Sequence, residues 1–340
     1  MHILFVKLTS MGDLIHALPA ITDASKALPG ISFDWVIDKN FSEVALWHPA
    51  VKNIITTEHR KWRKHPLQTL KNGEFKDFLH AIRQDSYDFV IDGQNNLKSA
   101  LVSFLTKKTR HGLDKHSARE SMAHFVYHKK YSIDKNLHAI TRLRMLFAQI
   151  FNYPFINDQV DYGIANYAFP EVPFKLPKPY VYFVHNASWP SKLYPEKDWQ
   201  QLIRMAANEK LNVVLPWGNA AEKVRAEHIS QGHPNAMVLP FCTLSQHARI
   251  LQESEGAICS DTGLSHLAAA LNVPAVTMYG PTSTRLIGTT GGNQLHAVSK
   301  FPCIECYKMR CNYGGKAQPI PLCLDAIKPE MLWLALKNLF

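Results

Sequence analysis

The chain has 340 residues, of which 46% are hydrophobic and 19% charged, and a formal net charge of +10. This length exceeds the ~250–300 residues at which a single core stops growing, so we expect two domains, and the composition is that of a globular protein rather than a disordered one. No run of about 18 apolar residues is present to form a membrane-spanning helix, and the first residues do not form a signal peptide. We therefore expect a cytoplasmic protein.

Short apolar runs alternate with amphipathic segments along the first half of the chain. Strands are predicted at residues 3–6, 33–37, 53–56 and 89–91, and helices at 14–28, 67–84, 96–106 and 134–151. This alternation is typical of a parallel sheet with helices on both faces. The sequence thus predicts a first α/β domain over residues 1–165.

A proline-rich segment, residues 166–179, interrupts the pattern and is predicted to be a linker. The second series has predicted strands at 180–185, 212–216, 237–239, 257–260 and 275–279, and helices at 197–208, 220–229, 245–253 and 263–271. A last helix is predicted at 329–340, with Pro329 well placed at its start. The predicted fold class is α/β: Rossmann-like domains over 1–165 and 180–328, with ligands in a central cleft at the carboxyl ends of the strands.

The turn after the first strand contains Gly12, which permits a tight turn, and Asp13, where a helix begins. Asp13 is an ordinary helix-capping residue, but a carboxylate facing the cleft could also accept a proton from a sugar hydroxyl. Neither a G-x-G-x-x-G motif nor a Walker A motif follows either first strand. This argues against a dinucleotide dehydrogenase and a P-loop NTPase.

A second turn, Asp261-Thr262-Gly263-Leu264-Ser265-His266, lies between a predicted strand and a predicted helix. A helix N-terminus exposes N–H groups and the positive end of the helix dipole, and Gly263 lets the backbone approach a phosphate closely. The alternative is that Asp261 or Thr262 only caps the helix.

Basic residues form two groups in the first half of the chain. One is residues 59–65, and the other comprises Lys98, Lys107, Lys108, Arg110, Lys115 and Arg119. Such groups meet nucleic acid, anionic lipid or a multiply charged acceptor, unless they are only a solvated face. No nucleic-acid-binding motif is evident, so we expect no nucleic acid partner.

Four cysteines, Cys303, Cys306, Cys311 and Cys323, are concentrated near the C-terminus in a segment rich in glycine and proline. Their spacing permits zinc or disulfides but is not a standard zinc-finger spacing. We favour free thiols and assign no metal.

Four motifs occur in order along the chain: Lys7-x-x-Ser10-Met11-Gly12-Asp13, Trp62-Arg63-Lys64, Ile91-Asp92-x-Gln94 and Asp261-Thr262-Gly263-Leu264-Ser265-His266-Leu267. With them the chain resembles the ADP-heptose:lipopolysaccharide heptosyltransferases, and most closely their type I branch. The resemblance covers almost the whole chain. It implies a glycosyltransferase-B fold whose last helix packs back on the N-terminal domain.

The resemblance also implies an activity: inverting transfer of heptose from ADP-heptose to the Kdo of Kdo-lipid A, with no cofactor required. The C-terminal domain would hold ADP-heptose and the N-terminal domain the acceptor. The protein would associate peripherally with the inner face of the inner membrane, whose surface is anionic. The alternatives are a sister heptosyltransferase with another core acceptor and a sugar-nucleotide epimerase of the same fold.

Residue roles follow from the same resemblance. Asp13 would be the general base, and Lys192 would bind the donor diphosphate and stabilise the leaving group. The other implied donor-binding residues are Ser188, Glu222, Cys242, Asp261, Thr262, Gly263 and His266, with Asp261 assigned to sugar or ribose hydroxyls, Glu222 to the ribose and Cys242 to the adenine. The expected acceptor-binding residues are Ser10, Met11, Gly12, Arg60, Lys61, Arg63, Lys64, Lys98 and Arg119, since Kdo and lipid A are anionic.

Overall fold

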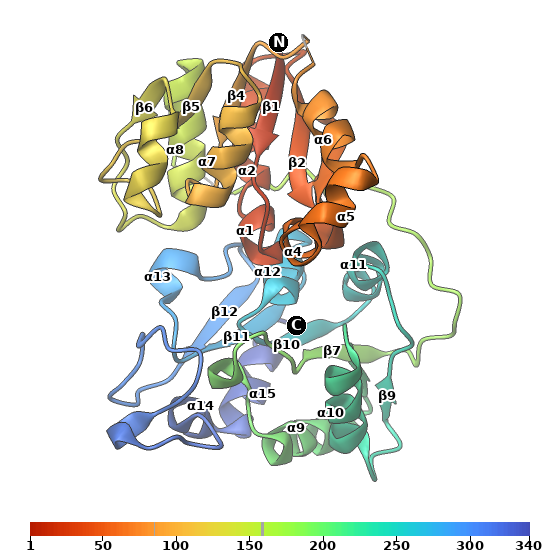
Figure 1. Ribbon diagram of the computed structural model, residues 1–340. Helices are drawn as coiled ribbons and strands as arrows, with labels where there is room; N and C mark the ends of the chain where they lie inside the picture. Colours follow the sequence, from red (N-terminus) through yellow and green to blue (C-terminus); the bar gives the residue numbers. More distant parts are fainter. Residues whose placement is uncertain (85, 158–159) are drawn as a thin grey trace. The chain divides into compact units, whose positions relative to one another are not determined.

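The computed structural model describes residues 1–84, 86–157 and 160–340, which form two compact units, Met1–Tyr167 and Ala168–Phe340 (Figure 1). Each unit is built on one six-stranded sheet in which every pair of neighbouring strands is parallel. Within the described ranges, no helix is both long and apolar enough to cross a membrane.

The sheet of the first unit has the strand order β3-β2-β1-β4-β5-β6. Its strands are β1 (His2–Val6), β2 (Ser32–Asp38), β3 (Val51–Thr57), β4 (Phe89–Asp92), β5 (Arg110–Leu113) and β6 (Lys129–Tyr131). The helices are α1 (Met11–Ile15), α2 (Leu18–Ala27), α3 (Ser42–Leu46), α4 (His59–Lys64), α5 (Pro66–Lys71), α6 (Glu74–Ile82), α7 (Leu97–Leu105) and α8 (Ala139–Phe151), with 3₁₀ turns η1 (Lys39–Phe41) and η2 (Ser121–Val126).

Strand β1 lies at the centre of this sheet and is buried on both faces. Leu4 and Val6 belong to a core cluster with side chains of α6 and α7. Phe5, on the opposite face, packs edge to face against Trp35 and Phe147, at ring-centroid distances of 5.0 and 5.4 Å. Because side chains alternate along a strand, one apolar run supplies the core of both faces.

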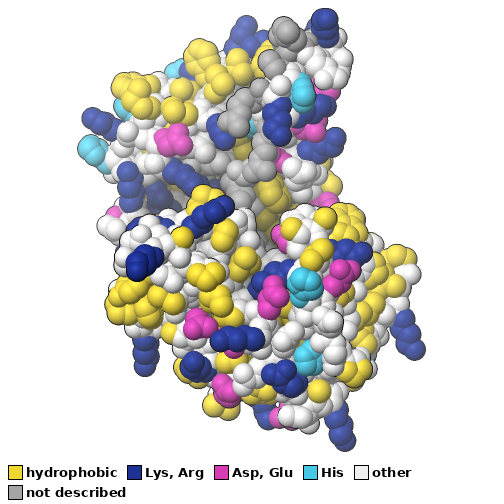
Figure 2. Space-filling model, turned by 60° about the horizontal axis from the view of Figure 1, so that its bottom comes forward, with side chains coloured by type: hydrophobic (Ala, Val, Ile, Leu, Met, Phe, Trp, Pro, Cys, Tyr) yellow, Lys and Arg dark blue, Asp and Glu magenta, His cyan; other side chains and the backbone are white. Residues whose placement is uncertain are grey.

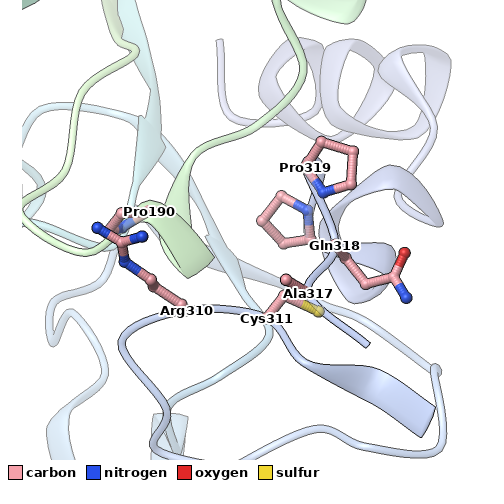
Figure 3. Close-up of a pocket in the computed structure, with 7 residues that line it drawn as sticks. Pro190, Arg310, Cys311, Ala317, Gln318 and Pro319 are labelled. Atoms are coloured by element: carbon pink, nitrogen blue, oxygen red, sulfur yellow. The ribbon is translucent and has the colours of Figure 1, made fainter. Parts of the chain in front are cut away.

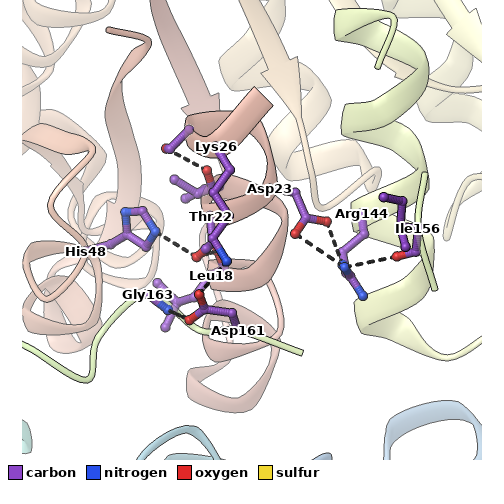
Figure 4. Close-up of polar contacts among 11 residues, drawn as sticks. Leu18, Thr22, Asp23, Lys26, His48, Arg144, Ile156, Asp161 and Gly163 are labelled. Carbon is purple, nitrogen blue, oxygen red and sulfur yellow. Dashed lines mark hydrogen bonds and ion pairs between the residues drawn. The ribbon is translucent and has the colours of Figure 1, made fainter. Parts of the chain in front are cut away.

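Polar contacts hold the last segment of the first unit against α2 (Figure 4). Asp161 accepts hydrogen bonds from the Lys26 ammonium at 2.7 Å and from the Gly163 N–H at 2.8 Å. Gly163 has a φ of +68°, and a Cβ there would lie 2.5 Å from His48 Nε2. Only glycine therefore fits between this segment and the imidazole.

Figure 4 also shows two buried polar pairs in the first unit. The Arg144 guanidinium bonds both carboxylate oxygens of Asp23, at 2.6 and 3.3 Å. His48 Nδ1 accepts the Ala50 N–H at 3.2 Å, so its Nε2 carries the proton toward Thr22 Oγ1 at 3.0 Å. Burial lowers the pKa of His48 to about 4.

The sheet of the second unit has the order β12-β11-β10-β7-β8-β9. Its strands are β7 (Tyr180–Val184), β8 (Asn212–Leu215), β9 (Ala236–Val238), β10 (Gly256–Ser260), β11 (Ala275–Tyr279) and β12 (Gln294–Val298). The helices are α9 (Glu196–Asn208), α10 (Ala220–Ser230), α11 (Leu244–Gln252), α12 (Gly263–Ala270), α13 (Thr284–Ile287), α14 (Leu322–Asp325) and α15 (Pro329–Lys337), with 3₁₀ turns η3 (Pro190–Lys192) and η4 (Tyr313–Gly315).

Helix α15 belongs to the second unit. Its buried side chains Leu332, Trp333 and Leu336 join a core cluster with α9 and with Val181 and Phe183 of β7. The resemblance implied that the last helix packs back on the N-terminal domain. This stays a prediction, and the structure shows only that the buried face of the helix lies in the core of its own unit.

Two predicted helices are each divided in the structure. The segment 14–28 contains α1 and α2, and Pro19 lies in the first turn of α2, where its missing N–H costs nothing. The segment 67–84 is interrupted by Gly73, whose φ is +75°, between α5 and α6. The helix predicted from residue 134 begins only at Ala139, since Asp134 forms a turn with the Asn136 N–H.

Candidate active site

The second unit brings three polar side chains together from the carboxyl ends of three adjacent strands. Asp261 directly follows β10, Thr282 follows β11, and Lys192 ends the 3₁₀ turn after β7. The Lys192 ammonium lies 2.6 Å from Asp261 Oδ2, and the Thr282 hydroxyl donates to the same oxygen at 2.5 Å. Ligands of open parallel sheets bind at this edge, where the strand order reverses.

The Lys192–Asp261 pair is largely shielded from water, with 14% of the lysine side chain and 4% of the aspartate exposed. The ammonium also lies 4.9 Å from the centre of the Trp189 ring, a cation–π distance. His266 Nε2 lies 3.9 Å from the other carboxylate oxygen, Oδ1. The sequence placed Lys192 and Asp261 at one site without predicting that they pair, and the hydroxyl-binding role of Asp261 remains a prediction.

Thr262 stands in an extended conformation at the N-cap of α12, which begins at Gly263. The Ser265 hydroxyl accepts the Thr262 N–H at 3.3 Å and donates to the Thr262 carbonyl at 2.6 Å. The predicted strand–turn–helix arrangement is therefore present, and the start of α12 lies directly after Asp261. Both interpretations of the turn, cap and anion site, are compatible with this geometry.

Glu222 and Cys242 follow the next two strands, β8 and β9, in the same sheet. Glu222 Oε2 accepts the Gly218 N–H at 2.7 Å, so the carboxylate closes the turn before α10. Cys242 is buried, and burial raises the pKa of its thiol to about 11. The thiol is thus neutral near pH 7 and behaves as a small apolar group. Ser188 is exposed, in the turn before Lys192.

The cysteine-containing loop is attached to the turn that carries Lys192. Ser191 is buried, its hydroxyl donates to the Lys308 carbonyl at 2.6 Å, and its N–H donates to the Met309 carbonyl at 3.1 Å. Figure 3 shows Pro190 of that turn and Arg310 and Cys311 of the loop lining one pocket. The cysteine-containing loop is therefore hydrogen-bonded to the turn that carries Lys192.

The four clustered cysteines are all free thiols, as are the buried Cys242 and Cys259. In the described part of the chain, no group of three or more His, Cys, Asp or Glu side chains could hold a metal ion. Cys323 lies against the strand-end turn at Gly280, where an added Cβ would come within 2.6 Å of its sulfur.

In the first unit, Asp13 lies in the short helix α1, after the central strand. Its Oδ2 accepts the Ser10 N–H at 3.1 Å and the Ser10 hydroxyl at 3.2 Å. Gln94, which follows β4, accepts the Leu8 and Thr9 N–H groups at 2.6 and 3.2 Å and so fixes the start of the same turn. Met11 is buried and Gly12 partly buried beside Asp13.

Lys7 is a buried lysine at the end of β1 to which we assigned no role from the sequence. Burial lowers its pKa, and the positive charges of Arg119 and Arg142 lower it further, while Asp13 and Asp92 raise it. Its ammonium donates to the Gly93 carbonyl at 3.1 Å. Asp13 and the predicted acceptor residue Arg119 are therefore both close enough to Lys7 to change its pKa.

The remaining predicted acceptor residues are spread over α4 and α7. The Lys61 ammonium is held by the Glu74 carboxylate, at 2.7 and 2.9 Å, so it is less available to an anionic acceptor than we expected. Lys64 and Lys98 are exposed; burial lowers the pKa of His59 on α4, and the positive charge of Lys98 lowers it further. The side chains of Arg60 and Arg63 lie outside the described part of the structure.

Four residues that contribute to these sites had no predicted role: Lys7, Gln94, Ser191 and Thr282. Lys7 and Gln94 belong to the recognised motifs, but the motifs do not indicate which groups these two side chains contact. Thr282 lies at the carboxyl end of a predicted strand, and that position could have identified it. Nothing in the sequence around Ser191 indicates its bonds to residues more than a hundred positions away.

Comparison with known proteins agrees with this geometry. The family model for glycosyltransferase family 9 (heptosyltransferase) matches residues 76–317. The lipopolysaccharide heptosyltransferase 1 of Pseudomonas aeruginosa is 40% identical over 97% of this chain and 95% of its own. The structure of Escherichia coli heptosyltransferase WaaC with ADP is 36% identical to this chain, and the match covers 100% of both chains with a TM-score of 0.86. The WaaC structure with ADP-2-deoxy-2-fluoro heptose is 35% identical, and that match covers 99% of both chains with a TM-score of 0.82.

Two parallel-sheet α/β units, with a lysine, a threonine and a helix N-terminus at the strand ends of the second, define a glycosyltransferase of the GT-B type. Within that class, the chain belongs to glycosyltransferase family 9, the heptosyltransferases.

Proposed function

We propose that the protein transfers L-glycero-D-manno-heptose from ADP-heptose to the Kdo of Kdo-lipid A, with inversion at the anomeric carbon. The observation that carries the proposal is the Lys192–Asp261–Thr282 cluster at the strand ends of the second unit. Its support is the similarity over nearly the full chain to proteins named lipopolysaccharide heptosyltransferase 1 and to the WaaC structures with ADP and an ADP-heptose analogue.

In the proposed reaction, a Kdo hydroxyl oxygen attacks the anomeric carbon of the donor heptose. The hydroxyl proton passes to the Asp13 carboxylate as the new carbon–oxygen bond forms. The bond to the β-phosphate breaks, and its electron pair leaves with ADP. Asp13 already accepts two hydrogen bonds on Oδ2, from Ser10, which orient the carboxylate.

Negative charge develops on the β-phosphate as the bond breaks, and Lys192 is the residue we assign to stabilise it. The ammonium is held on a rigid turn, between Trp189 and Asp261, before any donor binds. The N–H groups at the start of α12 would contact the same diphosphate, and Glu222 and Cys242 would contact the ribose and the adenine. The chain's own residues thus supply the base and the stabilising charge.

The acceptor and the location belong to the same proposal. Kdo carries a carboxylate and lipid A carries phosphates, so Arg119, Lys98 and Lys64, with Arg60 and Arg63, are the basic residues that we assign to acceptor recognition. We place the protein on the cytoplasmic side of the inner membrane, where it would associate peripherally with the anionic surface.

The test is ADP release by the purified protein with ADP-heptose and Kdo-lipid A. We expect acceptor-dependent release that falls by about 10²–10⁴-fold in Asp13→Asn, because the general base is lost while the shape is kept. Asp77→Asn, on the surface of α6, is the matched control and should keep full activity. Full activity of Asp13→Asn would exclude it as the base.

The acceptor panel separates the proposal from its alternatives. A heptosylated core acceptor used in preference to Kdo-lipid A would indicate a sister heptosyltransferase. Consumption of ADP-heptose to an isomeric sugar nucleotide, without ADP release, would indicate an epimerase.

A further inference from the structure

Helix α7 presents an apolar stripe to solvent. Leu97, Leu101 and Phe104 follow a spacing of four and three residues, which places them on one side of the helix. Each is more than half exposed, at 54%, 57% and 55%. An amphipathic helix of a globular domain buries its apolar stripe, so this one faces outward against the ordinary pattern.

The neighbouring 3₁₀ turn η2 extends the same surface. Ala123 and Tyr127 pack with Ala100 of α7 in a small buried cluster, so the two elements share an inner face. Their outer faces are then exposed together, and η2 adds Met122 and Phe125, which are 60% and 69% exposed. We call the five side chains Leu97, Leu101, Phe104, Met122 and Phe125 the α7–η2 surface.

The segment that carries the α7–η2 surface is rich in basic residues. Between residues 97 and 131 there are eight Lys or Arg (Lys98, Lys107, Lys108, Arg110, Lys115, Arg119, Lys129 and Lys130) and two acidic residues, Asp114 and Glu120. The Arg110 guanidinium lies 5.5 Å from the centre of the Phe104 ring. Figure 2 shows apolar side chains gathered on the first unit at the upper left, with Lys and Arg side chains close by.

The two acidic residues of this segment accept hydrogen bonds from backbone N–H groups of the protein. Asp114 accepts the His116 and Ser117 N–H groups, and Glu120 accepts the Leu97 N–H at the start of α7. The segment therefore combines exposed apolar side chains with a clear excess of positive charge. This is the composition of a protein surface that lies in the headgroup region of an anionic membrane.

We propose that the α7–η2 surface inserts into the interface of an anionic phospholipid bilayer and holds the first unit there. The inference rests on the proposed function, in which the acceptor is a membrane lipid, and names the surface by which the enzyme reaches it. Leu101, Phe104 and Phe125 enter the headgroup boundary, while Lys107, Lys108 and Lys115 meet the lipid phosphates. The surface is distinct from Asp13 and from the donor-binding residues.

The experiment measures co-sedimentation of the full chain with vesicles of phosphatidylcholine alone or of phosphatidylcholine with phosphatidylglycerol. We expect binding to the anionic vesicles, weakened by salt. The triple variant Leu101→Ser/Phe104→Ser/Phe125→Ser should lose about tenfold or more of this binding, because three apolar side chains no longer enter the lipid. Lys107→Gln/Lys108→Gln/Lys115→Gln should lose the preference for anionic vesicles.

The matched control is Val224→Ser/Met331→Ser/Leu334→Ser, three apolar residues of the second unit with similar exposure, at 49%, 62% and 61%. It should bind vesicles as the parent protein does. Equal loss in the control, or unchanged binding in the α7–η2 variant, would overturn the proposal. So would a parent protein that sediments as a dimer and a triple variant that sediments as a monomer, because a second copy would then cover the surface.

Two further measurements keep the outcome interpretable. Phe125→Trp changes one ring and should show a blue-shifted tryptophan emission only with anionic vesicles; absence of that shift contradicts insertion even where the triple variant does not fold. ADP release with a Kdo acceptor that lacks acyl chains should be the same in the triple variant and the parent protein. Failure of that reaction in the parent protein would contradict the proposed function, while vesicle binding would still test the surface.

Discussion

At the scale of single residues, the main feature is a carboxylate used to position a cation. Asp261 carries two close partners on one oxygen, the Lys192 ammonium and the Thr282 hydroxyl, and it is almost fully buried. Hydrogen bonds to a charged group contribute about 1.5–3 kcal/mol, and the loss of one partner leaves the buried charge less compensated. The position of Lys192 therefore depends on Thr282, which carries no charge itself.

The first prediction concerns Thr282. Thr282→Val removes the hydroxyl that donates to Asp261 while it keeps the shape of the side chain. We expect kcat/KM for ADP-heptose to fall by about 10–100-fold, which corresponds to the 1.5–3 kcal/mol of a hydrogen bond to a charged group. Steady-state kinetics measures it, with Thr282→Ser as the variant that should restore activity. If Val and Ser variants behave alike, the hydroxyl has no positioning role.

A second prediction at this scale concerns Ser191, whose hydroxyl joins the lysine turn to the cysteine loop. Ser191→Ala should raise KM for ADP-heptose several-fold and lower the free energy of unfolding by about 1 kcal/mol, the usual net contribution of one hydrogen bond. Ser230→Ala removes a comparable bond to a backbone carbonyl on α10, away from the site, and is the control. An equal change of KM in both variants would contradict the specific role.

At the scale of elements, the close approach of the segment around Gly163 to α2 and His48 depends on one missing side chain. A Cβ at Gly163 would meet His48 Nε2 at 2.5 Å and Thr22 Oγ1 at 2.6 Å. The His48 imidazole is fixed by its bonds to Thr22 and to the Ala50 N–H, so it cannot yield without breaking them. The end of the first unit is therefore held by packing as well as by the Asp161 bonds.

The prediction for this element compares two glycines with positive φ. Gly163→Ala should lower the free energy of unfolding by about 2–5 kcal/mol, because backbone strain of about 1–2 kcal/mol adds to overpacking of about 1–3 kcal/mol. Gly232→Ala, at a φ of +78° with nothing within 4 Å of the new Cβ, should show the strain alone. Denaturant unfolding measures both. If both variants lose the same free energy of unfolding, the contact of the new Cβ with His48 does not destabilise the protein.

At the scale of the whole molecule, the parallel sheets could be predicted because their central strands are buried on both faces. β1 and β7 are continuous apolar runs, and the sequence located both. The strands β5, β6 and β12 escaped prediction, since they are partly exposed and carry polar residues, and β5 and β6 are also short. For the site, the motifs predicted Asp13 and Asp261 and the resemblance predicted Lys192, but contacts such as Thr282 to Asp261 depend on which strands become neighbours.

A pH prediction also belongs to this scale, because it involves one buried histidine in each unit. Burial lowers the pKa of His48 to about 4 and that of His185 to about 3, below the ordinary value of 6.5. The unfolded chain then binds more protons, so stability is complete above pH ~6.5 and is lost as the pH falls toward 4. At pH 5 each histidine should cost about 2 kcal/mol relative to pH 7.

Urea unfolding of the protein at pH 7 and pH 5 measures this change. His48→Gln should remove its share of the pH dependence, since an amide does not titrate, whatever its effect on stability at pH 7. If the free energy of unfolding of His48→Gln changes with pH as in the parent protein, the pKa of this histidine does not differ between the folded and unfolded states.

The Lys192–Asp261 pair has a consequence for which ligands can bind at this site. An unpaired buried ammonium would attract any small anion of the cell, and inorganic phosphate is abundant there. With the carboxylate 2.6 Å away, the resting site is close to electrically neutral, and a ligand must supply enough charge and enough contacts to compete for the ammonium. A nucleotide diphosphate does so through several groups at once, whereas a lone phosphate does not. If Lys192 binds the donor diphosphate as proposed, Asp261 is placed to become the counterion of the ammonium again when the nucleotide leaves.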